Sequence, residues 1–350
     1  MDAVAARRSI IIQNYVCMGV ITLIWVVWGF SLCFGSSGWF IGDPSSFPML
    51  QGVDGAPLKS EARGKEHEAF VGGIPGLVFA AYQGMFAVIT PALMTGAFAE
   101  RIKFGPFIIF VVLWVHLVYF PWCHAVWGPN GWLGTWGVCD FAGGLVVHVT
   151  AGFSALATVM ALPSREKLEG APVDTTPHNV PYVALGTALL WFGWFGFNGA
   201  SELAAGGIQS INDVAAIFAN TNMAAVGGVL AATVTTAVLY KGKVDATMVF
   251  NGAIGGLVSI TAEPLAPSMG ASVLIGAVGG VLVVVSVPLL DKFKIDDVVG
   301  AIPAHLVCGI WGTLIVAASY GNHVMPVEIE GELQTSYFGQ LVGVLLTGVF

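Results

Sequence analysis

Two stretches of the chain place an acid and a histidine inside otherwise apolar sequence, where ionisable side chains are costly. They are DFAGGLVVHVTAG at residues 140–152 and DVVGAIPAHLVCG at residues 297–309. In both, the histidine follows the aspartate by eight residues, and a glycine follows the histidine by four. Side chains four residues apart share one face of a helix. Each stretch therefore predicts a helix that carries His148 or His305 on a face of small residues.

The composition indicates where these helices lie. Of the 350 residues, 56% are hydrophobic and 10% are charged, and the mean hydropathy is +0.82. No soluble domain of this length can hide so much apolar surface, because soluble proteins keep most charged side chains outside. Apolar runs of about 20 residues, enough to cross a hydrocarbon core of roughly 30 Å, recur along the chain. The sequence predicts an all-α, polytopic membrane helical bundle in the lipid bilayer, neither an enzyme nor a nucleic-acid-binding protein.

We expect residues 1–350 to form a single transmembrane domain of about nine complete spans and one truncated span, which begins near Tyr337. Ten of the thirteen Lys and Arg residues fall in alternate connections, and Lys59, Arg63 and Lys65 lie in the long loop at 36–72. By the positive-inside rule the amino terminus is cytoplasmic. The nine expected complete spans are Ile10–Gly35, Gly73–Ala99, Phe104–Trp122, Asp140–Leu162, Pro181–Leu203, Val214–Tyr240, Ala246–Ala262, Met269–Leu290 and Val298–Ser319.

The two Asp–His stretches enter the membrane from opposite faces in this topology. Similar segments of opposite direction are the signature of an inverted repeat, and such transporters commonly place their sites near the midplane. We therefore expect His148 and His305 to meet near mid-membrane. A single intramembrane histidine often serves only as a hydrogen bond between helices. A bis-histidine haem site is not expected, because none of the other five of the seven histidines is matched in the same way.

The small residues and cysteines add two expectations. Glycine pairs such as Gly227–Gly228 and Gly279–Gly280 predict close approach of helix backbones. The five cysteines form no metal-binding or redox spacing, so we predict no metal and no cofactor. Most of them are expected to be buried apolar residues, and a Cys123–Cys139 bridge near the outer face remains an alternative.

Several further motifs accompany the first Asp–His stretch. They are YQGMF at 82–86, GAFAERIKF at 96–104, HAVWG at 124–128, WFGWFGFN at 191–198 and FANTNMAA at 218–225. Together, and in this order, they resemble the blocks of the ammonium transporter family (Amt/Mep/Rh), the Amt branch in particular. The family has eleven spans with an external amino terminus, and by this resemblance the chain lacks the first span and most of the last.

The resemblance implies an outer site that recruits the ammonium ion. Trp127 and Tyr82 correspond to an aromatic cage, Ser201 to its hydroxyl, and Asp140 to a nearby acid that is not a direct ligand. Many relatives have phenylalanine at the place of Tyr82. Without the resemblance, Trp127 can equally be interpreted as an interfacial tryptophan. Ser201 can be interpreted as a small packing residue, and Asp140 as a helix cap.

Below that site the resemblance implies a gate and a pore. Phe86 and Phe197 match two stacked phenylalanines that close the pore, although both would be core aromatics in most bundles. His148 and His305 match a twin-histidine pair, and Trp194 matches a tryptophan beside it.

The expected function is transport of ammonium or ammonia across the membrane. The substrate is recruited outside, loses its proton and passes the histidines, with or without that proton. The resemblance further implies a multi-pass protein of the cell (plasma or inner) membrane, a homotrimer with one pore per subunit, and a PII-type regulatory protein as a candidate cytoplasmic partner. The alternatives are an ammonium sensor with the same fold and an Rh-type neutral gas channel.

Overall fold

The computed structural model describes residues 3–36, 38–56, 60–62, 65–67, 73–129, 131–170, 177–204, 206–319 and 335–350. Nearly all elements in these ranges are helical, which confirms the predicted all-α bundle. The exception is a hairpin of β1 (Ser60–Ala62) and β2 (Lys65–His67), paired antiparallel with Glu61 opposite Glu66. The helices are α1 (Ala3–Ile24), α2 (Phe30–Phe34), α3 (Gly76–Thr95), α4 (Phe104–Trp114), α5 (Phe120–Trp127), α6 (Trp132–Thr135), α7 (Thr150–Ala161), α8 (Arg165–Glu169), α9 (Val180–Gly199), α10 (Gly207–Leu239), α11 (Ala246–Thr261), α12 (Met269–Lys292), α13 (Cys308–Ser319) and α14 (Tyr337–Val349).

Four π-helical segments and two 3₁₀ turns interrupt or join these helices. A π-helix has one residue more per hydrogen-bonded turn than an α-helix, and such insertions occur frequently at functional sites. Two of the π-segments contain the predicted histidines. The π-segments are η1 (Trp25–Gly29), η3 (Val115–Tyr119), η4 (Gly144–Val149) and η6 (Ile302–Val307), and the 3₁₀ turns are η2 (Pro48–Leu50) and η5 (Ala200–Glu202).

Eight helical stretches among the described residues are long and apolar enough to cross a membrane. Two shorter apolar helices, α11 and α14, contain 16 and 13 residues. The span predicted at Ala246–Ala262 is therefore shorter than the roughly 20 residues of a full crossing. Every residue of α11 from Gly252 to Thr261 is buried. Because this half of the helix is surrounded by protein, its length need not match the bilayer.

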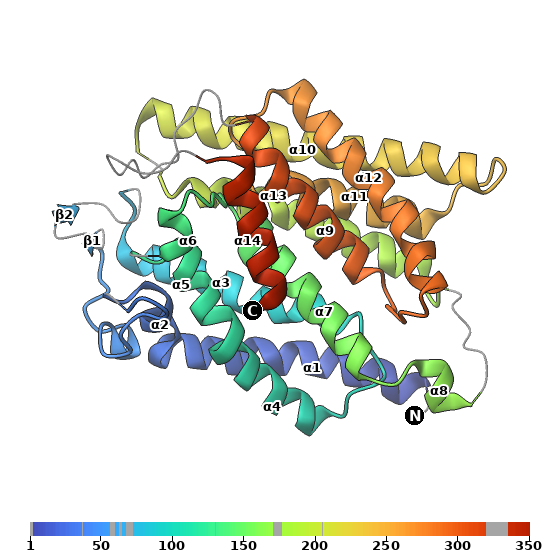
Figure 1. Ribbon diagram of the computed structural model, residues 1–350, viewed down its shortest axis with the longest axis horizontal. Helices are drawn as coiled ribbons and strands as arrows, with labels where there is room; N and C mark the ends of the chain where they lie inside the picture. The colour runs from blue at the N-terminus through green and yellow to red at the C-terminus, as the bar shows by residue number, and fades with distance from the viewer. Residues whose placement is uncertain are drawn as a thin grey trace.

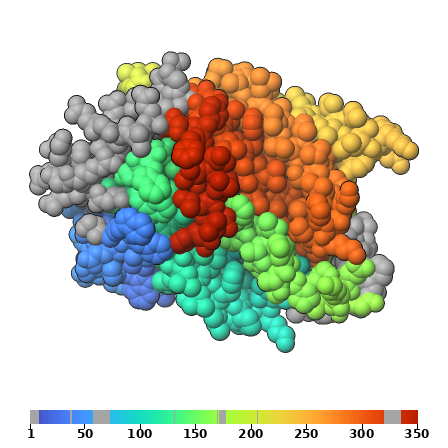
Figure 2. Space-filling model, viewed as in Figure 1, coloured from blue at the N-terminus to red at the C-terminus, as the bar shows by residue number. Residues whose placement is uncertain are grey.

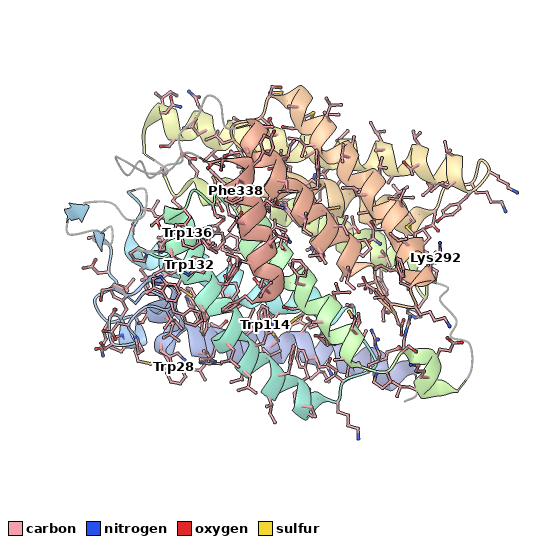
Figure 3. The ribbon with its side chains drawn as sticks, in the orientation of Figure 1. Trp28, Trp114, Trp132, Trp136, Lys292 and Phe338 are labelled. Atoms are coloured by element: carbon pink, nitrogen blue, oxygen red, sulfur yellow. The ribbon has the colours of Figure 1, made fainter. Side chains whose placement is uncertain are left out.

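Most of the elements that carry basic residues gather at one end of the bundle, and β2 with Lys65 is the exception. In Figure 1 the amino terminus, α8 and the turn between α10 and α11 lie at the right, and α6 and the β-hairpin lie at the left. Figure 3 places Lys292 toward the right end and Trp132 and Trp136 toward the left. This separation of charge fits the predicted orientation. Lys59 and Arg63, two of the exceptions, lie outside the described residues.

The carboxyl-terminal helix α14 lies between the two halves of the chain on the face seen in Figure 2. Its buried Gln340 accepts a hydrogen bond from the backbone N–H of Cys139 at 2.7 Å and donates to the carbonyl oxygens of Cys139 and Thr313 at 2.8 and 2.9 Å. The helix thereby holds the chain just before Asp140.

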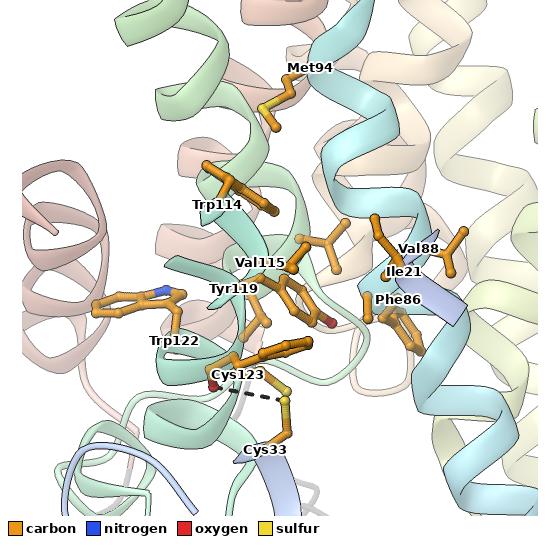
Figure 4. Packing of buried hydrophobic residues seen from close by; sticks show 14 of the residues in the cluster. Ile21, Cys33, Phe86, Val88, Met94, Trp114, Val115, Tyr119, Trp122 and Cys123 are labelled. Carbon is orange, nitrogen blue, oxygen red and sulfur yellow. Dashed lines mark hydrogen bonds between the residues drawn. The ribbon is translucent and has the colours of Figure 1, made fainter. Parts of the chain in front are cut away.

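The cysteines are buried free thiols, and the alternative of a Cys123–Cys139 bridge is wrong. Gln340 holds the backbone of Cys139 on both sides, and Cys123 instead lies beside Cys33, as Figure 4 shows. In the same view, Tyr119 and Val115 point toward Phe86 on α3. Burial of large side chains at this place fixes α3, and with it Phe86, against the first half of the bundle.

Glycines in the second half bring helix backbones into contact, as predicted. A Cβ on Gly228 would lie 2.2 Å from the carbonyl oxygen of Gly252, and one on Gly280 would lie 2.3 Å from that of Gly228. No side chain fits these spaces. The contacts pack the backbones of α10, α11 and α12 closely against one another.

Candidate functional site

Asp140 forms the start of the first predicted helix without being part of it. One carboxylate oxygen accepts the N–H of Gly143 at 3.0 Å, and the other accepts those of Leu145 and Val146 at 2.9 and 2.8 Å. The side chain is 1% exposed. These three bonds occupy N–H groups that a helix start leaves without partners. Asp140 therefore caps the helix, and an acid at this position is favoured by the helix dipole.

The second Asp–His stretch repeats this arrangement. The carboxylate of Asp297 accepts the N–H groups of Gly300, Ala301 and Ile302 at 3.1, 3.1 and 2.7 Å. Each aspartate is followed three residues later by a glycine of positive φ, 103° at Gly143 and 75° at Gly300. Only glycine adopts this conformation without strain.

Both helices therefore begin after their aspartates. The helix predicted from Asp140 starts at Gly144, and the one predicted from Val298 starts at Ala301. The cause is the same in each case, because the left-handed glycine turns the chain before helical geometry can start. A π-helical segment then carries the histidine, η4 in the first stretch and η6 in the second.

The two histidine-bearing helices pack in opposite directions through small residues. A Cβ on Gly152 would lie 2.5 Å from the backbone of Leu306, and one on Gly309 would lie 3.0 Å from Val149 and 3.3 Å from the Cβ of His148. Each glycine four residues after a histidine thus contacts the residue just after the opposite histidine. This pairing is the local geometry of an inverted repeat.

His148 and His305 meet as the sequence predicts. Their Nδ1 atoms lie 3.2 Å apart, and the rings are 8° from parallel with centroids 5.2 Å apart. The two residues are 1% and 8% exposed. A neutral imidazole has one donor and one acceptor nitrogen. One ring therefore donates through Nδ1–H and keeps an Nε2 lone pair, while the other accepts at Nδ1 and keeps an Nε2–H.

This assignment leaves the pair with an acceptor and a donor at its outer nitrogens. The Nε2 atom of His148 is buried and has no hydrogen-bond partner within the described residues. A buried polar atom without a partner is unfavourable, so a small hydrogen-bonding molecule beside it would be stabilised.

Trp194 and Phe197 of α9 cover His148. The Trp194 ring stacks on it at 5.3 Å and 13°, and Phe197 lies at 5.6 Å and 29°. The indole N–H of Trp194 donates to Thr261 of α11 at 2.8 Å. The histidines are therefore enclosed by aromatic surface on this side, which makes the surroundings of His148 apolar.

Phe86 and Phe197 are in contact above the histidines. Their ring centroids lie 4.7 Å apart at 63°, and Phe86 is 2% exposed. Phe86 also packs edge-on against Tyr82 at 5.0 Å and against Trp127 at 5.5 Å. The predicted gate and the predicted aromatic cage are thus one continuous cluster of rings.

The hydroxyl groups of Tyr82 and Ser201 meet on the same side. Their oxygens lie 2.8 Å apart, and each is within reach of the carbonyl oxygen of Phe197, at 2.5 Å from Tyr82 and 3.0 Å from Ser201. The carbonyl oxygen can accept a hydrogen bond from each hydroxyl. Oxygen lone pairs then remain as acceptors for an N–H donor.

Trp127 completes the group from α5. Its indole N–H donates to the backbone carbonyl of Asp140 at 2.7 Å. The aspartate therefore positions the tryptophan through its backbone, while its carboxylate is used by the helix start. All nine predicted site residues fall in this connected region.

Two supporting residues, Thr261 and Gln340, are not predicted from the sequence. Thr261 receives the Trp194 bond, and its carbonyl, with that of Ala262, accepts N–H groups of the Asp140 loop. Gln340 holds the same loop from α14. Neither has a spacing signal, because each acts across a long stretch of sequence. A polar residue in an otherwise apolar helix is the one cue that singles out Gln340.

Known proteins provide an independent comparison. A family model described as the Ammonium Transporter Family matches residues 4–350. An ammonium transporter of Mycobacterium bovis is 36% identical in an alignment of 322 residues that covers 88% of this chain and 66% of that protein. The chain thus spans just under two thirds of that curated relative.

Solved structures agree. Candida albicans Mep2 superposes with a TM-score of 0.84 at 32% identity, over 96% of this chain and 72% of Mep2. A structure described as a sensor Amt protein superposes with a TM-score of 0.80 at 30% identity, over 96% of this chain and 80% of the sensor.

Proposed function

Because this chain belongs to the ammonium transporter family, we propose that it moves ammonium nitrogen across a membrane by recruiting the ion outside and passing ammonia along the twin histidines. The observation that carries the proposal is the 3.2 Å contact between the Nδ1 atoms of His148 and His305 inside an aromatic enclosure. Ionisable side chains inside an apolar bundle are costly, and those that are present usually mark a substrate or ion pathway.

Recruitment takes place at Trp127, Tyr82 and Ser201. The aromatic faces attract a cation by about 0.5–2 kcal/mol, more as water is removed. The hydroxyl oxygens of Tyr82 and Ser201 accept N–H bonds. Asp140 adds a fixed negative charge nearby without touching the ion, because its carboxylate is held by the helix start.

The gate of Phe86 and Phe197 favours a neutral species. A bare cation loses its hydration in an apolar passage and is strongly disfavoured, whereas ammonia loses only a few hydrogen bonds. The proton is therefore released to solvent water on the outer side of the gate, and ammonia passes between the rings. Beyond them, the outer nitrogens of the imidazole pair offer one donor and one acceptor to the passing molecule.

Selectivity follows from this chemistry. Potassium is similar in size to ammonium but has no proton to release and no N–H groups to donate. It gains the attraction of the aromatic site but cannot become neutral at the gate. Discrimination thus depends on deprotonation rather than on the width of the passage.

The assembly and location belong to the same proposal. In the apolar part of the α9 stretch Val180–Glu202 only 6% of the residues are buried, although one face carries Trp194 and Phe197. Exposed side chains such as Tyr182 and Phe192, at 71% and 78%, suit contact with lipid or with further copies. We place this surface in a homotrimer of the cell (plasma or inner) membrane, with a PII-type regulatory protein as its candidate cytoplasmic partner.

The test is reconstitution of the full chain in proteoliposomes. Ammonium flux above that of protein-free liposomes, with potassium flux at the background level, is the expected result. Equal flux of both cations contradicts the proposal. Ammonium binding without any flux instead favours an ammonium sensor, the role suggested by the superposition on the sensor Amt protein.

A further inference from the structure

Glu202 is a buried acid next to the predicted recruitment site that none of the preceding steps uses. It ends the 3₁₀ turn η5, directly after Ser201, and is 6% exposed. Its Oε2 atom is fully buried and has no hydrogen-bond partner, and no ion pair is found for Glu202 within the described residues. Buried carboxylates are normally paired, so this one lacks the usual compensation.

The charged groups that act on Glu202 are acids. Asp213 of α10 and Glu263, which follows α11, both interact with Glu202 by charge repulsion. Asp213 accepts a hydrogen bond from Gln209 at 2.9 Å, and Glu263 accepts the backbone N–H groups of Leu265 and Ala266 at 3.0 Å. Neither supplies positive charge to Glu202.

Four of the basic residues that the structure describes lie at other places in the fold. Arg101 and Arg165 both contact Asp296, near the amino-terminal end of η6. Lys241 and Lys243 follow α10 at its far end from Asp213. Among the described residues, the charged groups that act on Glu202 are therefore negative, and a negative field concentrates cations at the mouth of a passage.

We propose that the Glu202 carboxylate is a second, outer subsite for a monovalent cation of the ammonium class, which it delivers to Ser201 and Tyr82. The subsite rests on the proposed transport function. A carboxylate oxygen forms strong hydrogen bonds with N–H donors. Glu202 follows Ser201 directly in the sequence. A divalent metal is not the expected occupant, because the described residues hold no group of three His, Cys, Asp or Glu that could ligate one.

The experiment compares Glu202→Gln with wild type in proteoliposomes supplied with ammonium chloride. Loss of the charge is expected to raise the half-saturation concentration at least about threefold at low ionic strength, and by less as salt screens the field. The maximal rate stays near that of wild type, since the gate and histidines are intact. Glu166→Gln, which removes one exposed negative charge from α8, is the matched control and leaves both values unchanged.

An unchanged half-saturation concentration in Glu202→Gln, with a normal maximal rate, overturns the subsite and leaves transport standing. Absence of ammonium flux in wild type overturns the proposed function itself. If the glutamine variant does not reach the membrane in folded form, the dependence of the wild-type half-saturation concentration on ionic strength provides the test instead. A wild-type half-saturation concentration that stays constant as ionic strength rises overturns the subsite.

Discussion

Gly152 packs directly against Leu306, with no room for a side chain between them. A Cβ at Gly152 would lie 2.5 Å from the backbone N and Cα of Leu306, closer than any real contact. Because Leu306 follows His305, this contact sets the distance between the two histidine-bearing helices. The imidazole pair therefore depends on a glycine that touches neither ring.

We predict that Gly152→Ala separates the two helices. Overpacking of a tight contact usually costs about 1–3 kcal/mol, and here the neighbour is backbone, which cannot rotate away. We expect a lower unfolding temperature of the purified protein and loss of most ammonium flux. Both are measured on the same detergent-solubilised and reconstituted samples.

Gly186→Ala is the matched control for this prediction. Gly186 lies in α9, and a Cβ there would meet nothing within 4 Å. Alanine favours helix over glycine by about 1 kcal/mol, so the control should be as stable as wild type or more stable. If Gly152→Ala behaves like Gly186→Ala, the close packing does not set the histidine contact.

The second prediction concerns His148. Replacing it with alanine removes the partner of His305 and the ring that Trp194 covers, while the capped helix start at Asp140 remains. We expect a folded protein that has lost selective ammonium transport. Currents carried by ammonium and by potassium are compared in planar bilayers or proteoliposomes. His116→Ala on η3 is the control, and selective ammonium current in His148→Ala would refute the role of the pair.

The third prediction separates recruitment from passage. Trp127→Leu removes an aromatic face worth about 0.5–2 kcal/mol to a bound cation, a factor of about 2 to 30 in half-saturation. Flux should fall more at low ammonium than at high. The bond from the Trp127 indole to the Asp140 carbonyl is also lost, so the maximal rate is recorded in parallel. Trp136→Leu, at an exposed site, is the control. If half-saturation is unchanged in Trp127→Leu, the cage assignment fails.

Much of this site was predictable from sequence because helical spacing is a local property. The eight-residue interval identified His148 and His305, and the charge pattern gave the two segments opposite directions. The structure then placed their Nδ1 atoms in contact across 157 positions of sequence. Spacing did not reveal the π-helical turns or the later helix starts, because these depend on Gly143 and Gly300 adopting positive φ.

Other features depend on partners that sequence cannot identify. The hydrogen bonds of Gln340 to Cys139 join positions 201 residues apart, and no local pattern encodes them. The short helix α11 was expected as a full span, since hydropathy does not distinguish burial in protein from burial in lipid. The roles of Tyr82 and Ser201 came from family resemblance, whereas their 2.8 Å contact came from the structure.

The fourth prediction tests the two capping aspartates against each other. Asp140→Asn retains one side-chain oxygen for the helix start but removes the charge, whose favourable interaction with the helix dipole is about 0.3–2 kcal/mol. Asp297→Asn makes the same change in the second repeat. Both variants should lose similar stability, but only Asp140→Asn should raise half-saturation for ammonium. Equal half-saturation in the two variants would mean that Asp140 is a cap and nothing more.

The fifth prediction concerns acid stability at the end opposite the recruitment site. Arg165 contacts Asp296 at 2.7 Å and Arg101 lies 3.6 Å from it. Burial favours a higher pKa for Asp296, but the hydrogen bonds of Arg165 and the charges of both arginines outweigh it, so the pKa lies below its ordinary value of 3.8.

A lowered pKa in the folded state stabilises the protein at pH values above the ordinary pKa, and this stabilisation is lost as the pH falls through the lowered pKa. The unfolding temperature of wild type should therefore drop more steeply below about pH 4 than that of Asp296→Asn. Asp291→Asn, an exposed acid on α12, should follow the wild-type curve; parallel curves for wild type and Asp296→Asn would show that the arginine contacts add no stability.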